Sequence, residues 1–182
     1  MAAARDDSSD TPGSRLSYGD PFQAPPEERR VDRRLRGRLL APVTVWTAGS
    51  GERRAGLTVS SLLVAEGDPA RLLGLLDPLS ALHDALDSTG RFLVHVLGAG
   101  DERLAALFAG RLPADPFVEA AFVEHPFGPR LEGDRHVVCC RVDSSEPAGF
   151  QVLVRAEIVE VHLAGAAAEP LGWYRGGYRS LA

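Results

Sequence analysis

The sequence lacks lysine altogether, and all 20 of its basic residues are arginine. Chemistry that needs a lysine, such as a Schiff base or the lysine of a P-loop, is therefore excluded. The sequence also has no GxGxxG, GxxxxGK(S/T) or GxSxG motif, which argues against Rossmann, P-loop and nucleophile-elbow enzymes. Its five histidines show no metal-ligand spacing. We predict no metal site and assign no catalytic side chain.

Cysteine is scarce as well, because Cys139 and Cys140 are the only two and they are adjacent. Neighbouring residues on a strand point to opposite faces, so we expect two reduced thiols, as is usual in cytoplasmic proteins. No uninterrupted apolar run approaches 18 residues, and the N-terminus has no apolar signal segment. We therefore expect a soluble, cytoplasmic protein without a membrane partner. The net charge of −5 argues against a nucleic-acid partner.

What the sequence does contain is 182 residues with 45% hydrophobic content, which suits one domain with a single core. Residues 1–28 are rich in Asp, Ser, Pro and Gly, and we predict a disordered tail followed by a domain over 29–182. Residues 29–40 hold six arginines, with apolar residues spaced four apart. This pattern favours a solvent-exposed helix over one that binds nucleic acid or an anionic membrane.

Strand patterns dominate the remaining chain. We predict strands over 43–48, 56–65, 71–76, 91–97, 136–142 and 150–163, and helices over 79–88 and 101–108. A regular alternation of strands and helices is missing. The order predicts a mainly β protein with short helices, built as a β-barrel with helical insertions.

The strand predicted over 56–65 begins with Gly56, Thr58, Ser60 and Ser61, and is more polar than a core strand requires. Backbone and hydroxyl groups along such a strand can hydrogen-bond a flat heterocycle, and a glycine lets the backbone come close. Downstream, Ser80 precedes a predicted helix whose first N–H groups can hold a phosphate, although Ser80 is also an ordinary helix cap. A flat ring and a phosphate together suggest flavin mononucleotide (FMN).

The ordered segments VTVWTAG, AGLTVSSLL, GDPARLLGLLD, SALHDALDSTGRFLVHVL and LAALFAG resemble the flavin reductase-like family. The resemblance runs from residue 43 to 110 and resumes at VLVRAEIVEV and at the terminal YRGGY. It implies an FMN-binding split β-barrel, usually a homodimer. It also implies that NAD(P)H reduces FMN or FAD by hydride transfer, and that the reduced flavin is supplied to a partner monooxygenase.

The resemblance also assigns site residues. The family's strand along the flavin ring falls on Gly56, Leu57, Thr58, Val59, Ser60 and Ser61. The segment for the phosphate and ribityl chain contributes Asp77, Ser80, Ala81 and Leu82, and further cofactor-binding positions are Phe108, Ala109, Tyr174 and Arg175. Gln151 stands on the nicotinamide side, where many relatives carry histidine. Arg91 and Arg175 are candidate charge partners.

Two features of these segments motivate an alternative function. The phosphate segment is unusually apolar, with Pro78, Leu79 and Leu82, and Gln151 replaces the histidine. The alternative is a flavin-binding or interaction protein on the same barrel, without nicotinamide turnover. The sequence leaves open FMN versus FAD, NADH versus NADPH, and the identity of any partner oxygenase.

Overall fold

The computed structural model describes residues 31–165 and 169–180, and the chain divides into two units, Met1–Arg36 and Gly37–Ala182. In the first unit, helix α1 spans Val31–Arg36 and ends four residues before the end of the helix predicted over 29–40, whose first two residues lie outside the described residues. The tail predicted over 1–28 lies outside the described residues. Among the described helices, none is long and apolar enough to cross a membrane.

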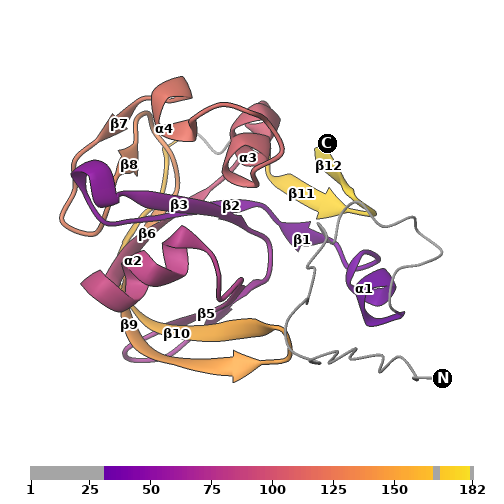
Figure 1. The fold of residues 1–182 in the computed structure, drawn as a ribbon, viewed down its shortest axis with the longest axis horizontal. Helices are drawn as coiled ribbons and strands as arrows, with labels where there is room; N and C mark the ends of the chain where they lie inside the picture. Colours follow the sequence, from indigo (N-terminus) through magenta and orange to yellow (C-terminus); the bar gives the residue numbers. More distant parts are fainter. Residues whose placement is uncertain (1–30, 166–168, 181–182) are drawn as a thin grey trace, which may run out of the picture. The chain divides into compact units, whose positions relative to one another are not determined.

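The second unit consists mainly of strands (Figure 1). The strands are β1 (Ala41–Pro42), β2 (Thr44–Ala48), β3 (Ala55–Val59), β4 (Leu62–Ala65), β5 (Arg71–Leu76), β6 (Arg91–Val96), β7 (Phe122–Val123), β8 (Arg130–Leu131), β9 (Val137–Ala148), β10 (Gln151–His162), β11 (Leu171–Tyr174) and β12 (Gly177–Ser180). The helices are α2 (Ala81–Thr89), α3 (Glu102–Phe108), α4 (Pro116–Glu119) and the 3₁₀ helix η1 (Gly51–Arg53).

Seven strands form one antiparallel sheet in the order β3-β2-β6-β9-β10-β5-β4. The sheet curls, and α2 lies between its upper and lower strands (Figure 1). Strands β1, β11 and β12 form a second sheet, and β7 pairs with β8. The predicted mainly β architecture with helical insertions is confirmed.

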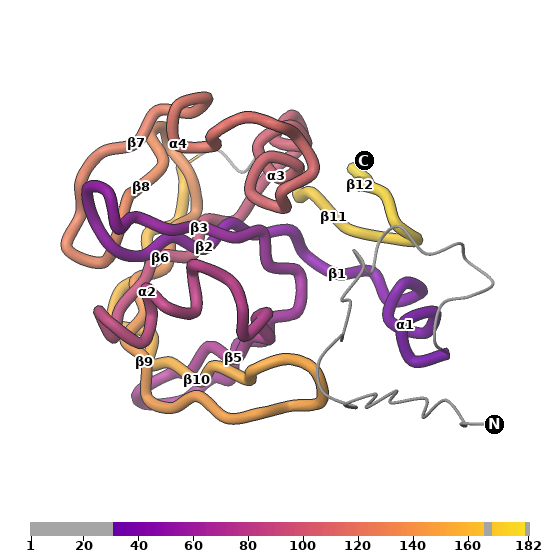
Figure 2. The backbone as a smooth tube through the Cα atoms, in the orientation of Figure 1, coloured from indigo at the N-terminus to yellow at the C-terminus, as the bar shows by residue number. Residues whose placement is uncertain are grey.

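The prediction of a single strand over residues 56–65 is wrong. The segment consists of two strands, β3 and β4, which lie at opposite edges of the seven-stranded sheet because β3 pairs with β2 and β4 pairs with β5. Only Ser60 and Ser61 join them, and Figure 2 shows the chain leaving β3 and turning towards β5. The local pattern of β-forming residues does not reveal which strand each half pairs with.

The main core fills the inside of the curl. Trp46 is fully buried and stacks on Phe92 with ring centroids 4.7 Å apart. Gly74 lets β5 pass close to Trp46, because a Cβ on Gly74 would lie 2.7 Å from Cζ2 of the indole ring. Leu82 and Leu86 of α2 close this core from one side.

The helix predicted over 79–88 is confirmed as α2. The Ser80 hydroxyl accepts a hydrogen bond from the His83 N–H at 3.3 Å and caps the start of the helix. At the other end Gly90 adopts φ 65°, the left-handed conformation in which glycine commonly ends helices. Both boundaries therefore follow from local chemistry.

The two cysteines are free thiols on opposite faces of β9, as predicted from their adjacency. Cys140 packs in the main core, whereas Cys139 packs with Leu93 and Val137 on the other side of the sheet. Burial raises the pKa of Cys140 to about 12 and also raises that of Cys139. Both thiols are thus protonated and unreactive at neutral pH.

Candidate flavin site

The predicted site begins at the two-residue link between β3 and β4. Ser60 and Ser61 are half-buried, and neither hydroxyl has a hydrogen-bond partner within residues 31–165 and 169–180. The carbonyl oxygen of Ser61 accepts a hydrogen bond from the Leu75 N–H at 2.9 Å. The link is therefore fixed to β5 through its backbone while its hydroxyls are available to a ligand.

On β3 itself, alternate side chains have different surroundings. Thr58 donates its hydroxyl proton to the carbonyl oxygen of Ala105 on α3 at 2.7 Å, and a Cβ on Gly56 would lie 2.8 Å from Cδ1 of Phe108. Gly56 and Thr58 thus hold β3 against α3. Leu57 packs against the main core and Val59 lies within it. A flavin ring along this strand would meet its backbone more than its side chains.

The segment predicted to hold the phosphate forms a tight turn into α2. The Ser80 hydroxyl donates to the Asp77 carbonyl oxygen at 2.7 Å, and Asp77 Oδ1 accepts from the Leu79 N–H at 2.9 Å. Ala81 is exposed at the first turn of the helix, whereas Leu82 is buried in the main core. The Ser80 hydroxyl is thus occupied within the turn, and polar contact with a ligand at this segment would come from backbone N–H groups such as that of Ala81.

Strand pairing brings three of the predicted segments together at the end of β5. Leu75, bonded to Ser61, is followed by Leu76, the last residue of β5. Val152 of β10 pairs with Leu76, so Gln151 and Asp77 stand one residue beyond this pair. The serine link, the phosphate segment and Gln151 are far apart in the sequence, yet they meet at one end of the sheet.

The other predicted positions lie elsewhere in the second unit. Phe108 is buried in a second core cluster and Ala109 is half-buried at the end of α3. Tyr174 ends β11, and Arg175 forms the turn to β12 with φ 49° and its guanidinium 5.5 Å from the Tyr174 ring. Among the described residues, no hydrogen bond or strand pairing joins this hairpin to Ser60 or Ser61. Arg91 begins β6, beyond the C-terminal end of α2.

The donors at the end of β5 fit a flavin. The polar edge of the isoalloxazine ring carries nitrogen and oxygen atoms, which the free hydroxyls of Ser60 and Ser61 match. A phosphate would find the backbone N–H of Ala81 at the start of α2, a nine-residue helix, because the Ser80 hydroxyl already donates to Asp77. Residues 77–82 include no cationic side chain. The site thus offers neutral hydrogen-bond donors and no charge pairing within this segment.

Comparison with known proteins is consistent with this assignment. A family profile described as "Flavin reductase like domain" matches residues 36–182. The chain is 34% identical over 157 residues to the NADH-dependent FMN reductase AsuE2 of Streptomyces nodosus subsp. asukaensis, covering 82% of this chain and 83% of the relative. It is 28% identical to the reductase component of a 4-nitrophenol 4-monooxygenase/4-nitrocatechol 2-monooxygenase from Rhodococcus opacus, over 84% of this chain and 81% of the relative.

The fold also matches solved structures. The NADH:FAD oxidoreductase SgcE6 of Streptomyces globisporus C-1027 superposes with a TM-score of 0.75 and 26% sequence identity, covering 87% of this chain and 96% of that one. The predicted split-barrel fold is therefore confirmed. The sequence, its folded architecture and these relatives agree that the chain belongs to the flavin reductase-like family.

Proposed function

We propose that this protein is an NAD(P)H-dependent flavin reductase that acts on FMN or FAD. The observation that carries the proposal is that the Ser60–Ser61 link and the Asp77–Ser80 turn both adjoin the end of β5, in a chain of the flavin reductase-like family. When bound, the flavin supplies the hydride-accepting chemistry, which no side chain of this protein provides.

The protein's own part in the reaction is binding and orientation. Ser60 and Ser61 donate hydrogen bonds to the polar edge of the ring, while Thr58 holds the strand in place through Ala105. The N–H of Ala81 binds the phosphate at the start of α2, and Ser80 fixes this turn through its hydrogen bonds to Asp77 and His83. Gln151, next to the end of β5, lies on the nicotinamide side. Orientation of two reactants in one site lowers the entropic part of the barrier.

The proposal includes two partners of this chain, an oxygenase and a second copy of the chain. The relative from Rhodococcus opacus is named as the reductase component of a monooxygenase, so we infer that this chain also supplies reduced flavin to an oxygenase. A homodimer and a cytoplasmic location remain predictions. Light scattering of the purified protein tests the dimer, because a monomer at micromolar concentration would contradict it.

The reductase proposal is tested by adding FMN or FAD to the purified full chain and following the absorbance of NADH or NADPH. We expect NADH or NADPH to be oxidised well above the rate of the protein-free control with at least one combination of nicotinamide nucleotide and flavin. Quenching of FMN fluorescence without oxidation would support the alternative of flavin binding without turnover. Absence of both quenching and oxidation contradicts a flavin site altogether.

The serine link is tested by the double variant Ser60→Ala/Ser61→Ala. Two lost neutral hydrogen bonds of about 1 kcal/mol each should weaken FMN binding about 30-fold. Ser88→Ala is the matched control, because Ser88 is an exposed serine on α2. Equal FMN affinity in the double variant and the control would remove the serine link from the site.

A further inference from the structure

Two arginines stand directly opposite each other on the outer face of the seven-stranded sheet. Arg91 of β6 pairs with Arg141 of β9 in antiparallel register. The next residues, Phe92 and Cys140, both point into the main core, so the two arginines share the opposite face. Like charges directly opposite on neighbouring strands are destabilising. The sequence therefore tolerates a repulsion here that a neutral residue would avoid.

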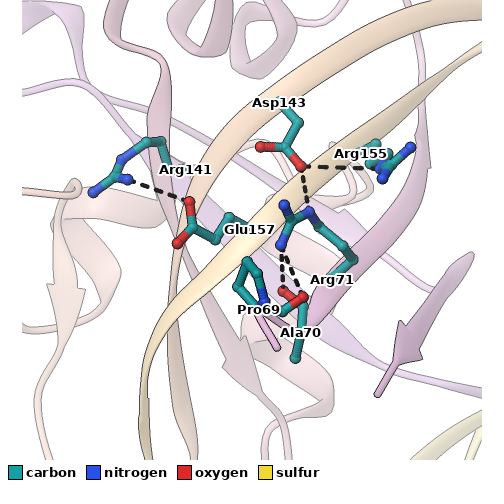
Figure 3. A network of polar contacts seen from close by, with 7 residues as sticks. All are labelled: Pro69, Ala70, Arg71, Arg141, Asp143, Arg155 and Glu157. Carbon is teal, nitrogen blue, oxygen red and sulfur yellow. Dashed lines mark hydrogen bonds and ion pairs between the residues drawn. The ribbon is translucent and has the colours of Figure 1, made fainter. Parts of the chain in front are cut away.

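Two carboxylates on this face are engaged with arginines other than Arg91. Glu157 accepts from one Nη of Arg141 at 3.2 Å, and Asp143 lies between Arg71 and Arg155 (Figure 3). Arg91 has no carboxylate partner within residues 31–165 and 169–180, and its guanidinium lies 5.9 Å from the centroid of the Phe127 ring. Within these described residues, no carboxylate therefore neutralises the positive charge of Arg91.

A cavity of about 360 Å³ opens between these side chains, lined by Thr89, Gly90, Arg91, Phe127, Arg141 and Val142. Its volume is at the lower end of the range for small-molecule sites, about 300 to 1,000 Å³. Two guanidinium groups provide forked donors that match the oxygens of a phosphate. The Phe127 ring adds an aromatic surface on which a flat base can stack.

We propose that this cavity binds the phosphomonoester group of a nucleotide, with Arg91 and Arg141 as its cationic ligands and Phe127 beside the base. Anion binding turns the Arg91–Arg141 repulsion into two attractions to one phosphate. The cavity is separate from the flavin phosphate position. Ser80 and Gly90 lie at opposite ends of α2, about 15 Å apart by the rise of a helix.

Isothermal titration calorimetry of the full chain with 2′-AMP, 5′-AMP and inorganic phosphate, at constant ionic strength, tests the proposal. Wild type is expected to bind at least one nucleotide, and Arg91→Gln to weaken that binding at least tenfold. Arg155→Gln is the control, because Arg155 is an exposed arginine on the same sheet face that contacts Asp143 and lies outside the cavity. Its affinity should match wild type.

The two nucleotides distinguish the source of the phosphate. Tighter binding of 2′-AMP supports a dinucleotide with a 2′-phosphate, and tighter binding of 5′-AMP supports a 5′-phosphorylated nucleotide. No nucleotide binding, binding of inorganic phosphate alone, or equal weakening by Arg91→Gln and Arg155→Gln would overturn the proposal. Because no turnover is measured, the outcome does not depend on the reductase function.

Stability provides an independent check that Arg91→Gln remains folded. Without phosphate, its urea midpoint is expected to equal or exceed that of wild type, because the substitution removes the repulsion from Arg141. Added phosphate should raise the midpoint of wild type and leave that of Arg91→Gln unchanged. A clearly lower midpoint for Arg91→Gln in phosphate-free buffer would contradict the repulsion on which the proposal rests.

Discussion

Acid should destabilise this protein through His95, whose side chain is fully buried on β6. Its Nδ1 lies 3.1 Å from the Val45 carbonyl oxygen, and its Nε2 accepts from the Leu131 N–H at 3.2 Å. Because Nε2 accepts a hydrogen bond, the ring is neutral and carries its proton on Nδ1. Protonation of Nε2 would break the bond to Leu131 and leave a charge in the core.

The size of this destabilisation follows from the pKa of His95. Burial lowers the pKa of His95 from the ordinary 6.5 to about 4, and the charges of Arg135 and Arg130 act in the same direction. The unfolded chain therefore binds a proton between these two values that the folded protein does not bind. Stability from neutral His95 is fully present above pH 6.5 and is lost as the pH falls to about 4. The loss reaches about 3 kcal/mol in total.

The assay is urea unfolding followed by tryptophan fluorescence, to which Trp46, buried and stacked on Phe92, and Trp173 both contribute. Between about pH 7.5 and about pH 4.5 the free energy of unfolding should fall by about 2.5 kcal/mol through His95. His95→Gln is the reference, since glutamine can donate to Val45 and accept from Leu131 without titrating. The carboxylates that also titrate are common to both proteins and cancel in the difference.

The result that would refute this argument is the same loss of stability in wild type and in His95→Gln over this pH range. Such an outcome would mean that His95 accepts a proton in the folded state as readily as in the unfolded chain. If His95→Gln were less stable at every pH by the same amount, the substitution would have changed only the packing and not the pH dependence of the free energy of unfolding.

Three further substitutions test the packing around the candidate site by the same urea assay. Thr58→Val removes the hydrogen bond to Ala105 at nearly constant volume and should cost about 1 kcal/mol; no loss would mean that this bond does not hold β3 to α3. Gly74→Ala places a Cβ against the Trp46 ring and should cost about 1–3 kcal/mol. Gly67→Ala, in an exposed turn, is the control and should change stability by less than about 0.5 kcal/mol. Ser80→Ala removes the cap of α2 and should cost about 1 kcal/mol, whereas unchanged stability would contradict the capping role.

Much of the secondary structure could be predicted from the sequence because its causes are local. Ser80 and Gly90 mark the ends of α2 by capping chemistry that involves residues only a few positions away. Short apolar runs likewise predicted β5 at its observed bounds and β6 to within one residue. The strand predicted over 56–65 failed because its interruption at Ser60 and Ser61 depends on distant partners.

The sequence by itself determined a mainly β chain, the helix caps and the polar character of the link at Ser60 and Ser61, since each depends on neighbouring residues. Only the tertiary structure decided that Gln151 stands beside the end of β5, and that Arg91 and Arg141 pair on the neighbouring strands β6 and β9. These placements depend on strand register between segments dozens of residues apart. A shift of one residue would send each side chain to the other face of the sheet, so the register alone sets which groups meet.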